Sequence, residues 1–251
     1  MVRIIMSGCN GRMGQVISGI VEADSDAQIV AGVDIFTEKK NLYPVYKSID
    51  EVKEEADVVI DFSNPSNLDS LLAAGEAKGL ALVLCTTGYS KEQLDKINEA
   101  AKKTAVLRSA NMSVGVNVLF KLVAEATKVL SERGYDIDIV EEHHRNKLDA
   151  PSGTAIAIAD AINEAANNKY EYVYDRSSRR EKRPDNEIGI SSVRGGSIVG
   201  VHDAIFAGLD EVIEIKHTAY SRAIFGKGAV AAAKYLLGKG AGMYSMQDVI
   251  A

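Results

Sequence analysis

The sequence of 251 residues contains no tryptophan, two cysteines and four prolines. Two cysteines, Cys9 and Cys85, are too few for a disulfide framework, and we expect both to be small buried thiols without a redox role. No apolar run reaches the roughly 18 residues that a membrane-spanning helix requires. The residues before the first glycines are too few for the apolar part of a signal peptide. We therefore expect no membrane partner and a cytoplasmic location.

The sequence also lacks an excess of basic residues. Lysine and arginine number 29 against 35 acidic residues, which gives a formal net charge of -6 and a pI near 5.4. Nucleic-acid binding usually needs a basic face, so we predict no nucleic-acid partner. The local exception is the arginine-rich segment 176–183, which follows three tyrosines on which bases could stack. We interpret this segment as a solvated loop, because charge runs usually face water.

What the sequence does contain is typical of a globular α/β protein. It has 21 glycines, 46% hydrophobic residues and no low-complexity tract. Strands are predicted at 2–6, 27–33, 56–62, 80–85 and 106–110, with helical patterns between them and a long helix to about residue 133. The runs at 56–62 and 80–85 are nearly continuously apolar. Such runs are typical of parallel strands covered on both faces. Their ends carry loops rich in Ser, Thr, Asn and Gly, and such loops gather at the ligand-binding edge of an open sheet.

The turn SGCNGRMG has the order of a phosphate-binding unit, because it lies between a strand and a helix. Gly8, Gly11 and Gly14 would let the backbone approach a pyrophosphate at the helix N-terminus. Glycine turns that bind nothing also occur. Asp34 adds support, because it ends the second strand twenty residues after Gly14, where dinucleotide folds keep an acid for the ribose hydroxyls.

The stretch HHRNKLDAPSGT, residues 143–154, has two interpretations. It is either an ordinary solvated turn or an anion site that contains a proton donor. A strand over 137–142 delivers His143 and His144, and Lys147 lies shortly before a helix that begins near Ser152. Helix N-termini favour anions. Adjacent residues of a strand point to opposite faces and no cysteines stand at zinc spacing, so we predict no metal site.

Three β-branched runs at 188–194, 198–207 and 211–219 predict an antiparallel or mixed sheet that packs against a copy of itself. We thus predict a Rossmann-like dinucleotide-binding domain, 1–112 and 222–251, plus a second α+β domain, 113–221, with a mixed sheet used for oligomerisation. Two choices stay open. Arg194 either reaches a ligand or ends a strand, and Asn111 and Ser113 either bind a ligand or form a turn and helix cap.

With these motifs in view, the chain resembles the 4-hydroxy-tetrahydrodipicolinate reductase (dihydrodipicolinate reductase) family. GCNGRMG and EEHHRNKLDAPSGTA carry the resemblance, and DFSNPSN, CTTGY, SANMSVGVN, VRGGSIVGVHDAIFAG and GAVAAAKYLLGKGAGMYSMQDVI extend it over essentially the whole chain. The mid-chain block is specific, whereas the glycine turn is not. The resemblance implies NADH- or NADPH-dependent reduction of a cyclic imine dicarboxylate in lysine and diaminopimelate biosynthesis, by a homotetramer.

The resemblance also implies residue roles. His143 would be the proton donor, and Lys147 would hold a carboxylate and help protonation. The residues implied to bind the substrate carboxylates are His144, Ser152, Gly153 and Thr154. Those implied to line the cofactor are Gly8, Asn10, Gly11, Arg12, Met13, Gly14, Asp34, Phe62, Thr86, Thr87, Gly88, Ala110, Asn111 and Met112.

Two hypotheses go further. Arg145 and Lys147 should lower the pKa of His143, and a bound dicarboxylate should raise it. Asp34 should repel a 2′-phosphate, and Ile35 and Asn64 stand where relatives often carry arginine, so we predict a lean toward NADH. Lys39 and Lys40 are near enough in sequence to allow NADPH. A different reductase on the same scaffold and a dinucleotide sensor remain the rival interpretations.

Overall fold

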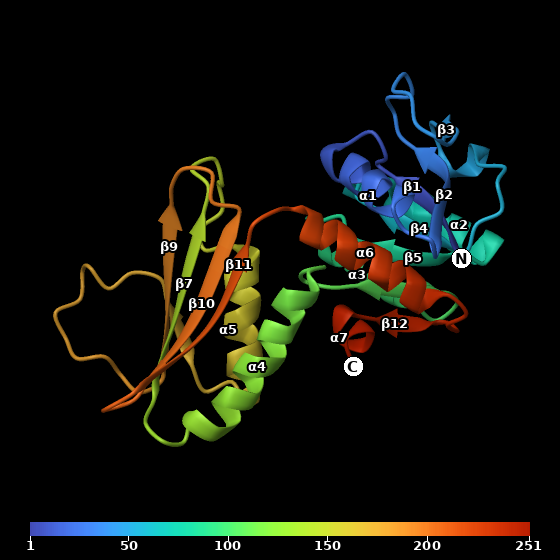
Figure 1. Cartoon of the computed structure of the whole chain (residues 1–251). Coiled ribbons are helices and arrows are strands. Elements are labelled where there is room, and N and C mark those ends of the chain that lie inside the picture. The colour runs from blue at the N-terminus through green and yellow to red at the C-terminus, as the bar shows by residue number, and fades with distance from the viewer. The chain divides into compact units, whose positions relative to one another are not determined.

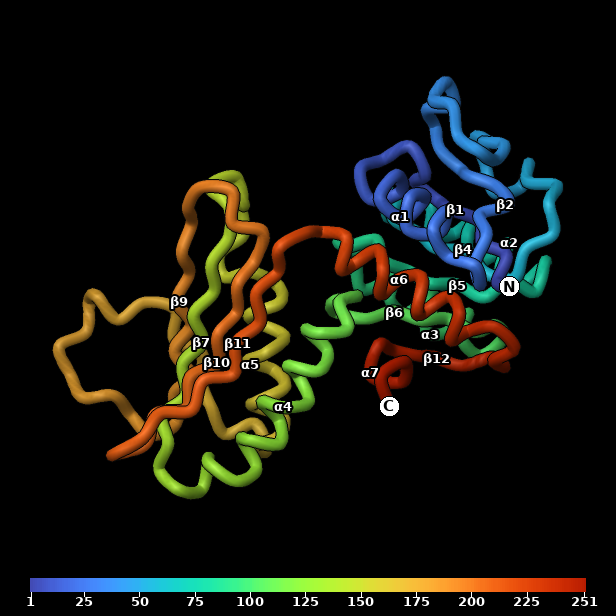
Figure 2. Tube along the Cα trace, in the orientation of Figure 1, coloured from blue at the N-terminus to red at the C-terminus, as the bar shows by residue number.

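The computed structural model describes residues 1–251, and the chain divides into two compact units. Unit 1 consists of Met1–Ser113 and Ala223–Ala251, and unit 2 is Val114–Arg222. Unit 1 therefore contains both ends of the chain, the blue and the red segments of Figures 1 and 2. No helix is long and apolar enough to cross a membrane.

Unit 1 is built on a parallel sheet of seven strands in the order β12-β6-β5-β4-β1-β2-β3. The strands are β1 (Val2–Ser7), β2 (Ala27–Val33), β3 (Val45–Tyr46), β4 (Val58–Asp61), β5 (Ala81–Leu84), β6 (Ala105–Arg108) and β12 (Gly242–Tyr244). The order 3-2-1-4-5-6 is that of the doubly wound dinucleotide fold, with its switch point between β1 and β4. The predicted Rossmann-like sheet is confirmed.

Helices cover both faces of this sheet. The helices are α1 (Arg12–Glu22), α2 (Leu68–Lys78), α3 (Lys91–Ala100), α6 (Ala223–Leu236) and α7 (Met246–Val249), with 3-10 turns at Ile49–Glu51 and Pro65–Asn67. Along β1, Ile4 and Met6 join the core beneath α1 and α6, while Ile5 joins the core beneath α2 and α3. Because alternate residues face opposite layers that are both apolar, the strand is a continuous apolar run.

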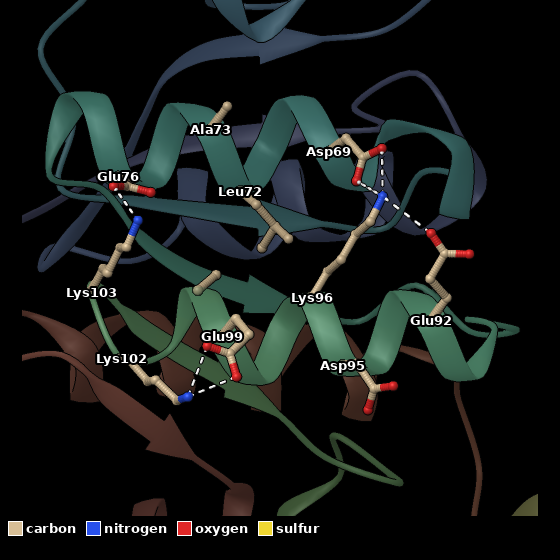
Figure 3. Close-up of a pocket in the computed structure, with 11 residues that line it drawn as sticks. Asp69, Leu72, Ala73, Glu76, Glu92, Asp95, Lys96, Glu99, Lys102 and Lys103 are labelled. Carbon is tan, nitrogen blue, oxygen red and sulfur yellow. Dashed lines mark hydrogen bonds and ion pairs between the residues drawn. The ribbon is translucent and has the colours of Figure 1, made fainter.

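A groove between α2 and α3 is lined by paired charges (Figure 3). Lys96 contacts Asp69 at 3.0 Å, and Lys103 contacts Glu76 at 2.7 Å. The first pair joins α2 to α3, and the second joins α2 to the turn that follows α3. They are solvent-exposed, so each contributes at most about 1 kcal/mol to stability. We assign this groove a structural role.

Unit 2 has a mixed sheet in the order β11-β10-β7-β9-β8, as predicted. Its strands are β7 (Asp136–His143), β8 (Glu171–Val173), β9 (Glu187–Arg194), β10 (Gly200–Ala207) and β11 (Val212–Ala219). Strand β10 is antiparallel to β7 and β11, whereas β9 is parallel to β7. The long helices α4 (Val114–Leu130) and α5 (Gly153–Ala165) share one core with the sheet and lie along its same side in Figure 1.

The other face of the unit 2 sheet is not covered by any helix of unit 2. Val140, Val193 and Ile205 alternate with core-facing neighbours and belong to this outer face. Val193 is 46% exposed. An apolar sheet face without a covering layer is typical of a surface that packs against another chain.

The arginine-rich segment is not a solvated loop throughout, which corrects the prediction. Arg176 and Arg179 form ion pairs with the buried carboxylate of Glu187. Arg183 pairs with Asp138 and donates to the backbone carbonyls of Ile137 and Glu187. These arginines fasten the loop before β9 to the sheet.

Other differences from the predictions are small. The short strands β3, β8 and β12 have two or three residues, too few to show a hydrophobic period. Helix α4 ends at Leu130, and turn residues follow it up to the next strand. Helix α3 begins with a capping box formed by Ser90 and Gln93.

Candidate active site

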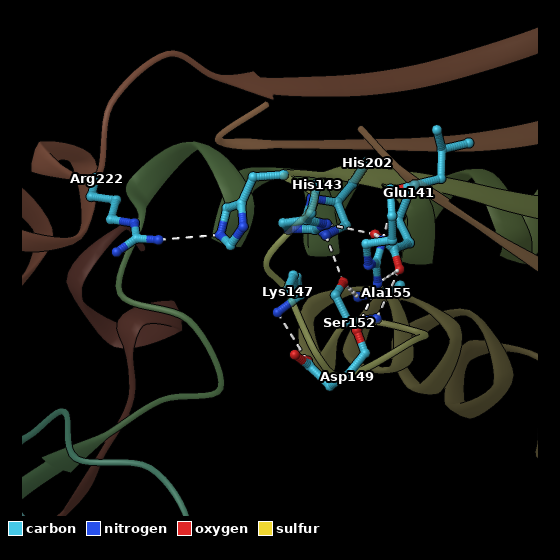
Figure 4. Close-up of polar contacts among 11 residues, drawn as sticks. Glu141, His143, Lys147, Asp149, Ser152, Ala155, His202 and Arg222 are labelled. Atoms are coloured by element: carbon cyan, nitrogen blue, oxygen red, sulfur yellow. Dashed lines mark hydrogen bonds and ion pairs between the residues drawn. The ribbon is translucent and has the colours of Figure 1, made fainter. Parts of the chain in front are cut away.

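The stretch 143–154 connects the end of β7 to the start of α5 (Figure 4). Strand β7 ends at His143, and Ser152 is the N-cap of α5, whose hydroxyl accepts a hydrogen bond from the amide of Ala155 at 3.1 Å. Gly153 and Thr154 form the first turn, as the sequence predicted. A histidine and the positive end of a helix dipole are therefore brought together by one short connection.

Glu141, two residues before His143 on the same face of β7, organises the site. Its Oε2 lies 2.5 Å from Nδ1 of His143. The guanidinium of Arg194 donates to both carboxylate oxygens, at 2.8 and 2.6 Å, and the amide of Ser152 donates to Oε1 at 3.0 Å. Arg194 is thus committed to a buried carboxylate within the chain, and its carboxylate partner in turn holds His143.

The surroundings set the charges of this group. Burial alone would raise the pKa of Glu141, but hydrogen bonds from Arg194, His143 and Ser152 lower it to about 2. Burial lowers the pKa of His143, and the positive charges of Lys147 and Arg194 lower it further. The hydrogen bond and the negative charge of Glu141 raise it but do not outweigh these effects. The direction agrees with the hypothesis from the sequence. Its causes differ, because burial is the largest and the second cation is Arg194 in place of Arg145.

His202, on β10, lies beside His143. Their ring centroids are 5.1 Å apart in an edge-to-face arrangement, and Nε2 of His202 is 3.0 Å from the hydroxyl of Ser152. Burial lowers the pKa of His202 to about 3, so this ring is neutral near pH 7. Ser152 is itself buried, and its amide and hydroxyl are both engaged within the chain.

The remaining polar residues of this site are more accessible. The ammonium of Lys147 lies 2.9 Å from Asp149, and Nε2 of His144 lies 3.2 Å from the guanidinium of Arg222 (Figure 4). His143 and His144 have different partners, since His143 contacts Glu141 and His202 while His144 contacts Arg222. No group of histidine, cysteine and carboxylate side chains is arranged to hold a metal ion.

In unit 1, the glycine turn and the ends of β2 and β4 line a cavity of about 790 Å³, a size within the range of ligand pockets. Six of the residues predicted to bind cofactor line it: Gly8, Asn10, Gly11, Arg12, Asp34 and Phe62. Gly14 lies beneath the turn, where an added Cβ would be 2.2 Å from the carbonyl oxygen of Gly8. Helix α1 starts here without a side-chain cap, which leaves its positive end available to an anion.

Asp34 is held in this cavity by the backbone. Its Oδ2 accepts from the amide of Asn10 at 2.9 Å, and its Oδ1 accepts from the amide of Phe36 at 3.0 Å. Two lysines, Lys39 and Lys47, line the same cavity, whereas Lys40 does not belong to its lining. The sequence pointed to Lys39 and missed Lys47, which is far from the motif along the chain.

The other predicted cofactor residues lie outside this cavity. Thr86 is buried and donates to Asp61 at 2.7 Å, while Thr87, Gly88 and Ala110 are exposed. The Asn111 side chain accepts from the amide of Ser113 at 2.8 Å, which gives the predicted turn. Met13 is half-buried in the first turn of α1, and the Met112 side chain belongs to the core.

Asp61 is a residue that the sequence analysis missed. This fully buried carboxylate at the end of β4 accepts from the hydroxyls of Ser63 at 2.6 Å and Thr86 at 2.7 Å. It thereby ties the loop DFSNPSN to the loop CTTGY at the carboxyl edge of the sheet. An acid that ends a buried strand is the available signal in the sequence.

The expectation of two buried thiols holds for Cys9, whereas Cys85 is only partly buried. Cys9 is buried in the core, and burial raises its pKa to about 11. Cys85 has no disulfide partner, and burial raises its pKa too. Neither thiol is an activated nucleophile.

Family models match nearly the whole chain. Residues 2–112 match the family model for the N-terminus of dihydrodipicolinate reductase, and residues 115–250 match the model for its C-terminus.

Individual relatives span the whole chain. The curated 4-hydroxy-tetrahydrodipicolinate reductase of Caldanaerobacter subterraneus subsp. tengcongensis is 52% identical, over 100% of this chain and 98% of that protein. The Clostridium tetani protein of the same name is 50% identical, over 100% and 97%. A solved structure, dipicolinate-bound dihydrodipicolinate reductase from Paenisporosarcina sp. TG-14, has the same fold, with a TM-score of 0.83 and 23% identity over all of both chains. This chain belongs to the dihydrodipicolinate reductase family.

Proposed function

We propose that the chain reduces 4-hydroxy-tetrahydrodipicolinate, by way of dihydrodipicolinate, to tetrahydrodipicolinate in lysine and diaminopimelate biosynthesis. Full-length relatives at 52% and 50% identity carry the name of this reductase. The observation that carries the proposal is the arrangement of His143, Lys147 and the N-terminus of α5 on one short connection, with Glu141 against the imidazole. A dinucleotide sensor would have no use for this second site.

The residues of unit 1 fit a nicotinamide dinucleotide. The uncapped start of α1 and the glycine turn suit a pyrophosphate, and Asp34 suits the ribose hydroxyls. When bound in reduced form, the cofactor supplies a hydride to the substrate. We propose that the cofactor also contacts Thr87 and Gly88, in the CTTGY loop that Thr86 ties to Asp61, and the 110–112 loop that follows the next strand of the sheet.

In unit 2 we propose that Lys147, His144, Gly153 and Thr154 bind the two carboxylates of the substrate. One lysine near 4 Å from a carboxylate contributes roughly 4 kcal/mol of gross attraction at an effective dielectric of 20, before the cost of desolvation. We keep Ser152 among the proposed carboxylate-binding residues because it begins helix α5. Its amide and hydroxyl already form hydrogen bonds with Glu141, His202 and Ala155.

We propose that His143 donates the proton that the reduced ring needs. Its lowered pKa keeps the imidazole largely neutral in the free protein. A bound dicarboxylate adds negative charge beside Lys147, so it should raise the pKa of His143 and favour the protonated form. Substrate binding would then favour protonation of His143, the residue that donates the proton.

The cofactor preference and the assembly are finer proposals. Asp34 would repel a 2′-phosphate, so we propose a preference for NADH. The cations Lys39 and Lys47 would still permit NADPH to bind, with lower affinity than NADH. We also propose a homotetramer that assembles through the outer face of the unit 2 sheet, and a cytoplasmic location.

The decisive experiment follows the oxidation of NADH and of NADPH with freshly generated 4-hydroxy-tetrahydrodipicolinate. We expect turnover with both cofactors and a higher kcat/KM with NADH. His143→Gln and Lys147→Ala should each lower kcat by about 100-fold or more, while NADH binding measured by fluorescence stays nearly unchanged. Cofactor binding without turnover would favour a sensor, turnover of another imine alone would favour a different reductase, and equal kcat/KM values would refute the NADH preference.

A further inference from the structure

We propose that Glu141 is a positioning residue that fixes the tautomer of His143, so that the proton passed to the substrate is carried on Nε2. This inference deepens the proposed reductase function, and its kinetic test rests on that function. Its spectroscopic test does not require turnover.

Hydrogen bonds hold the Glu141 carboxylate against the ring of His143. Its side chain is fully buried, and it shares one face of β7 with His143 because the two residues are two positions apart. Each oxygen has two partners: Oε1 accepts from Ser152 and Arg194, and Oε2 contacts Arg194 and Nδ1 of His143. Three N–H donors from outside the histidine hold the carboxylate in one orientation.

An ionised carboxylate can only accept hydrogen bonds. Nδ1 of His143 must therefore carry a hydrogen in the neutral ring and in the charged ring alike. The proton that the imidazole gains and loses is then the one on Nε2. Gly200 leaves that nitrogen uncrowded, since an added Cβ would lie 3.1 Å from it.

The groups that face His143 come from four segments. Glu141 lies on its own strand, Arg194 on β9, His202 on β10 and Lys147 on the connection to α5. Two of these are cations and His202 is neutral near pH 7, so Glu141 is the one group among them that stabilises the imidazolium. Without its charge, burial and both cations would all oppose protonation of the ring.

Glu141→Gln separates this role from a structural one. The glutamine keeps the shape, removes the charge and offers an N–H group that permits the other tautomer. We expect kcat to fall by about tenfold or more, and its decline at high pH to begin about 1 to 3 pH units lower. The KM for the substrate should change much less. The matched control is Glu142→Gln, one residue further on and on the opposite face of β7, which should leave kcat and its pH profile unchanged.

The second measurement is nitrogen NMR of the unliganded protein with labelled histidine, in which His143→Gln identifies the signals of His143. Neutral His143 should carry its hydrogen on Nδ1 in the wild type and become a mixture of tautomers in Glu141→Gln. A hydrogen on Nε2 in the wild type, or a kcat profile of Glu141→Gln that keeps the wild-type pH dependence, would overturn the proposal. If the variant does not fold, the wild-type spectrum decides alone. If the wild type lacks reductase activity, the proposed function fails and the tautomer is still determined.

Discussion

At the scale of single residues, burial is the largest cause of the lowered pKa of His143, His202 and His217. His202 is only 4% exposed, and its Nδ1 has no hydrogen-bond partner. Its folded pKa of about 3 lies far below the ordinary value of 6.5. The unfolded chain therefore binds more protons than the folded chain between these two values.

The free energy of unfolding therefore falls as the pH is lowered through this range. The contribution of neutral His202 to the free energy of unfolding is fully present above pH 6.5 and is lost as the pH falls toward 3. We expect His202→Gln to reduce the loss of stability between pH 6.5 and 4.5 by about 1.4 kcal/mol per pH unit relative to the wild type. Urea unfolding at a series of pH values measures this. Parallel curves for the two proteins would contradict the assignment.

At the scale of elements, helix α1 shows how one residue type has opposite effects at two positions. Gly14 faces the turn, where an added Cβ would be 2.2 Å from the carbonyl of Gly8 and 2.6 Å from the backbone of Cys9. Gly19, one and a half turns later, is exposed with no atom within 4 Å of an added Cβ. Only glycine fits at position 14. At position 19 glycine merely lowers the helix propensity, because a larger residue would meet no other atom.

We therefore predict that Gly14→Ala lowers the free energy of unfolding by about 1–3 kcal/mol and weakens NADH binding, because the turn must move. Gly19→Ala is the matched variant in the same helix. It should raise the free energy of unfolding by about 1 kcal/mol and leave NADH binding unchanged. Thermal melting and fluorescence titration test the pair. Equal effects of the two alanines would show that the close packing of the turn is unimportant.

The alternation of residues in strands is the second principle at this scale. Glu141 and His143 share one face of β7, and Val140 and Glu142 share the other. One strand register therefore fixes the place of the proposed proton donor and the composition of the outer face. The same β7 strand thus serves the proposed chemistry on one side and the proposed assembly on the other.

For the whole molecule, the uncovered sheet face of unit 2 leads to a prediction on assembly. Val193→Asp places a charge on that face, which would be costly to bury between copies of the chain. We expect the wild type to sediment as a tetramer, and Val193→Asp to yield smaller species at micromolar concentration. Leu122→Asp is the control, since Leu122 is similarly exposed, at 50% against 46%, but lies on α4. A monomeric wild type or an unchanged mass for Val193→Asp would refute the proposed interface.

The motifs predicted much of the fold and the centre of the candidate site. The glycine turn, the acid at Asp34 and the helix start at Ser152 were all correctly located, because each depends on residues close in sequence. The prediction of a solvated loop at 176–183 was only partly correct, because most of the segment is exposed but three of its arginines form ion pairs. Its arginines meet Glu187 and Asp138, and the latter is 45 residues from Arg183, so no local pattern could reveal the pairing.

The sequence by itself determined the longer strands and helices, where the turn and the helix start lie, and which histidine and lysine stand beside them. These features follow from local hydrophobic periods, glycine geometry and helix capping. Only the tertiary structure decided that Arg194, 53 residues away, closes on Glu141, and that β7 lies between β9 and β10. The physical reason is that a buried charge is stable only with its partner, and strand pairing alone brings that partner into place.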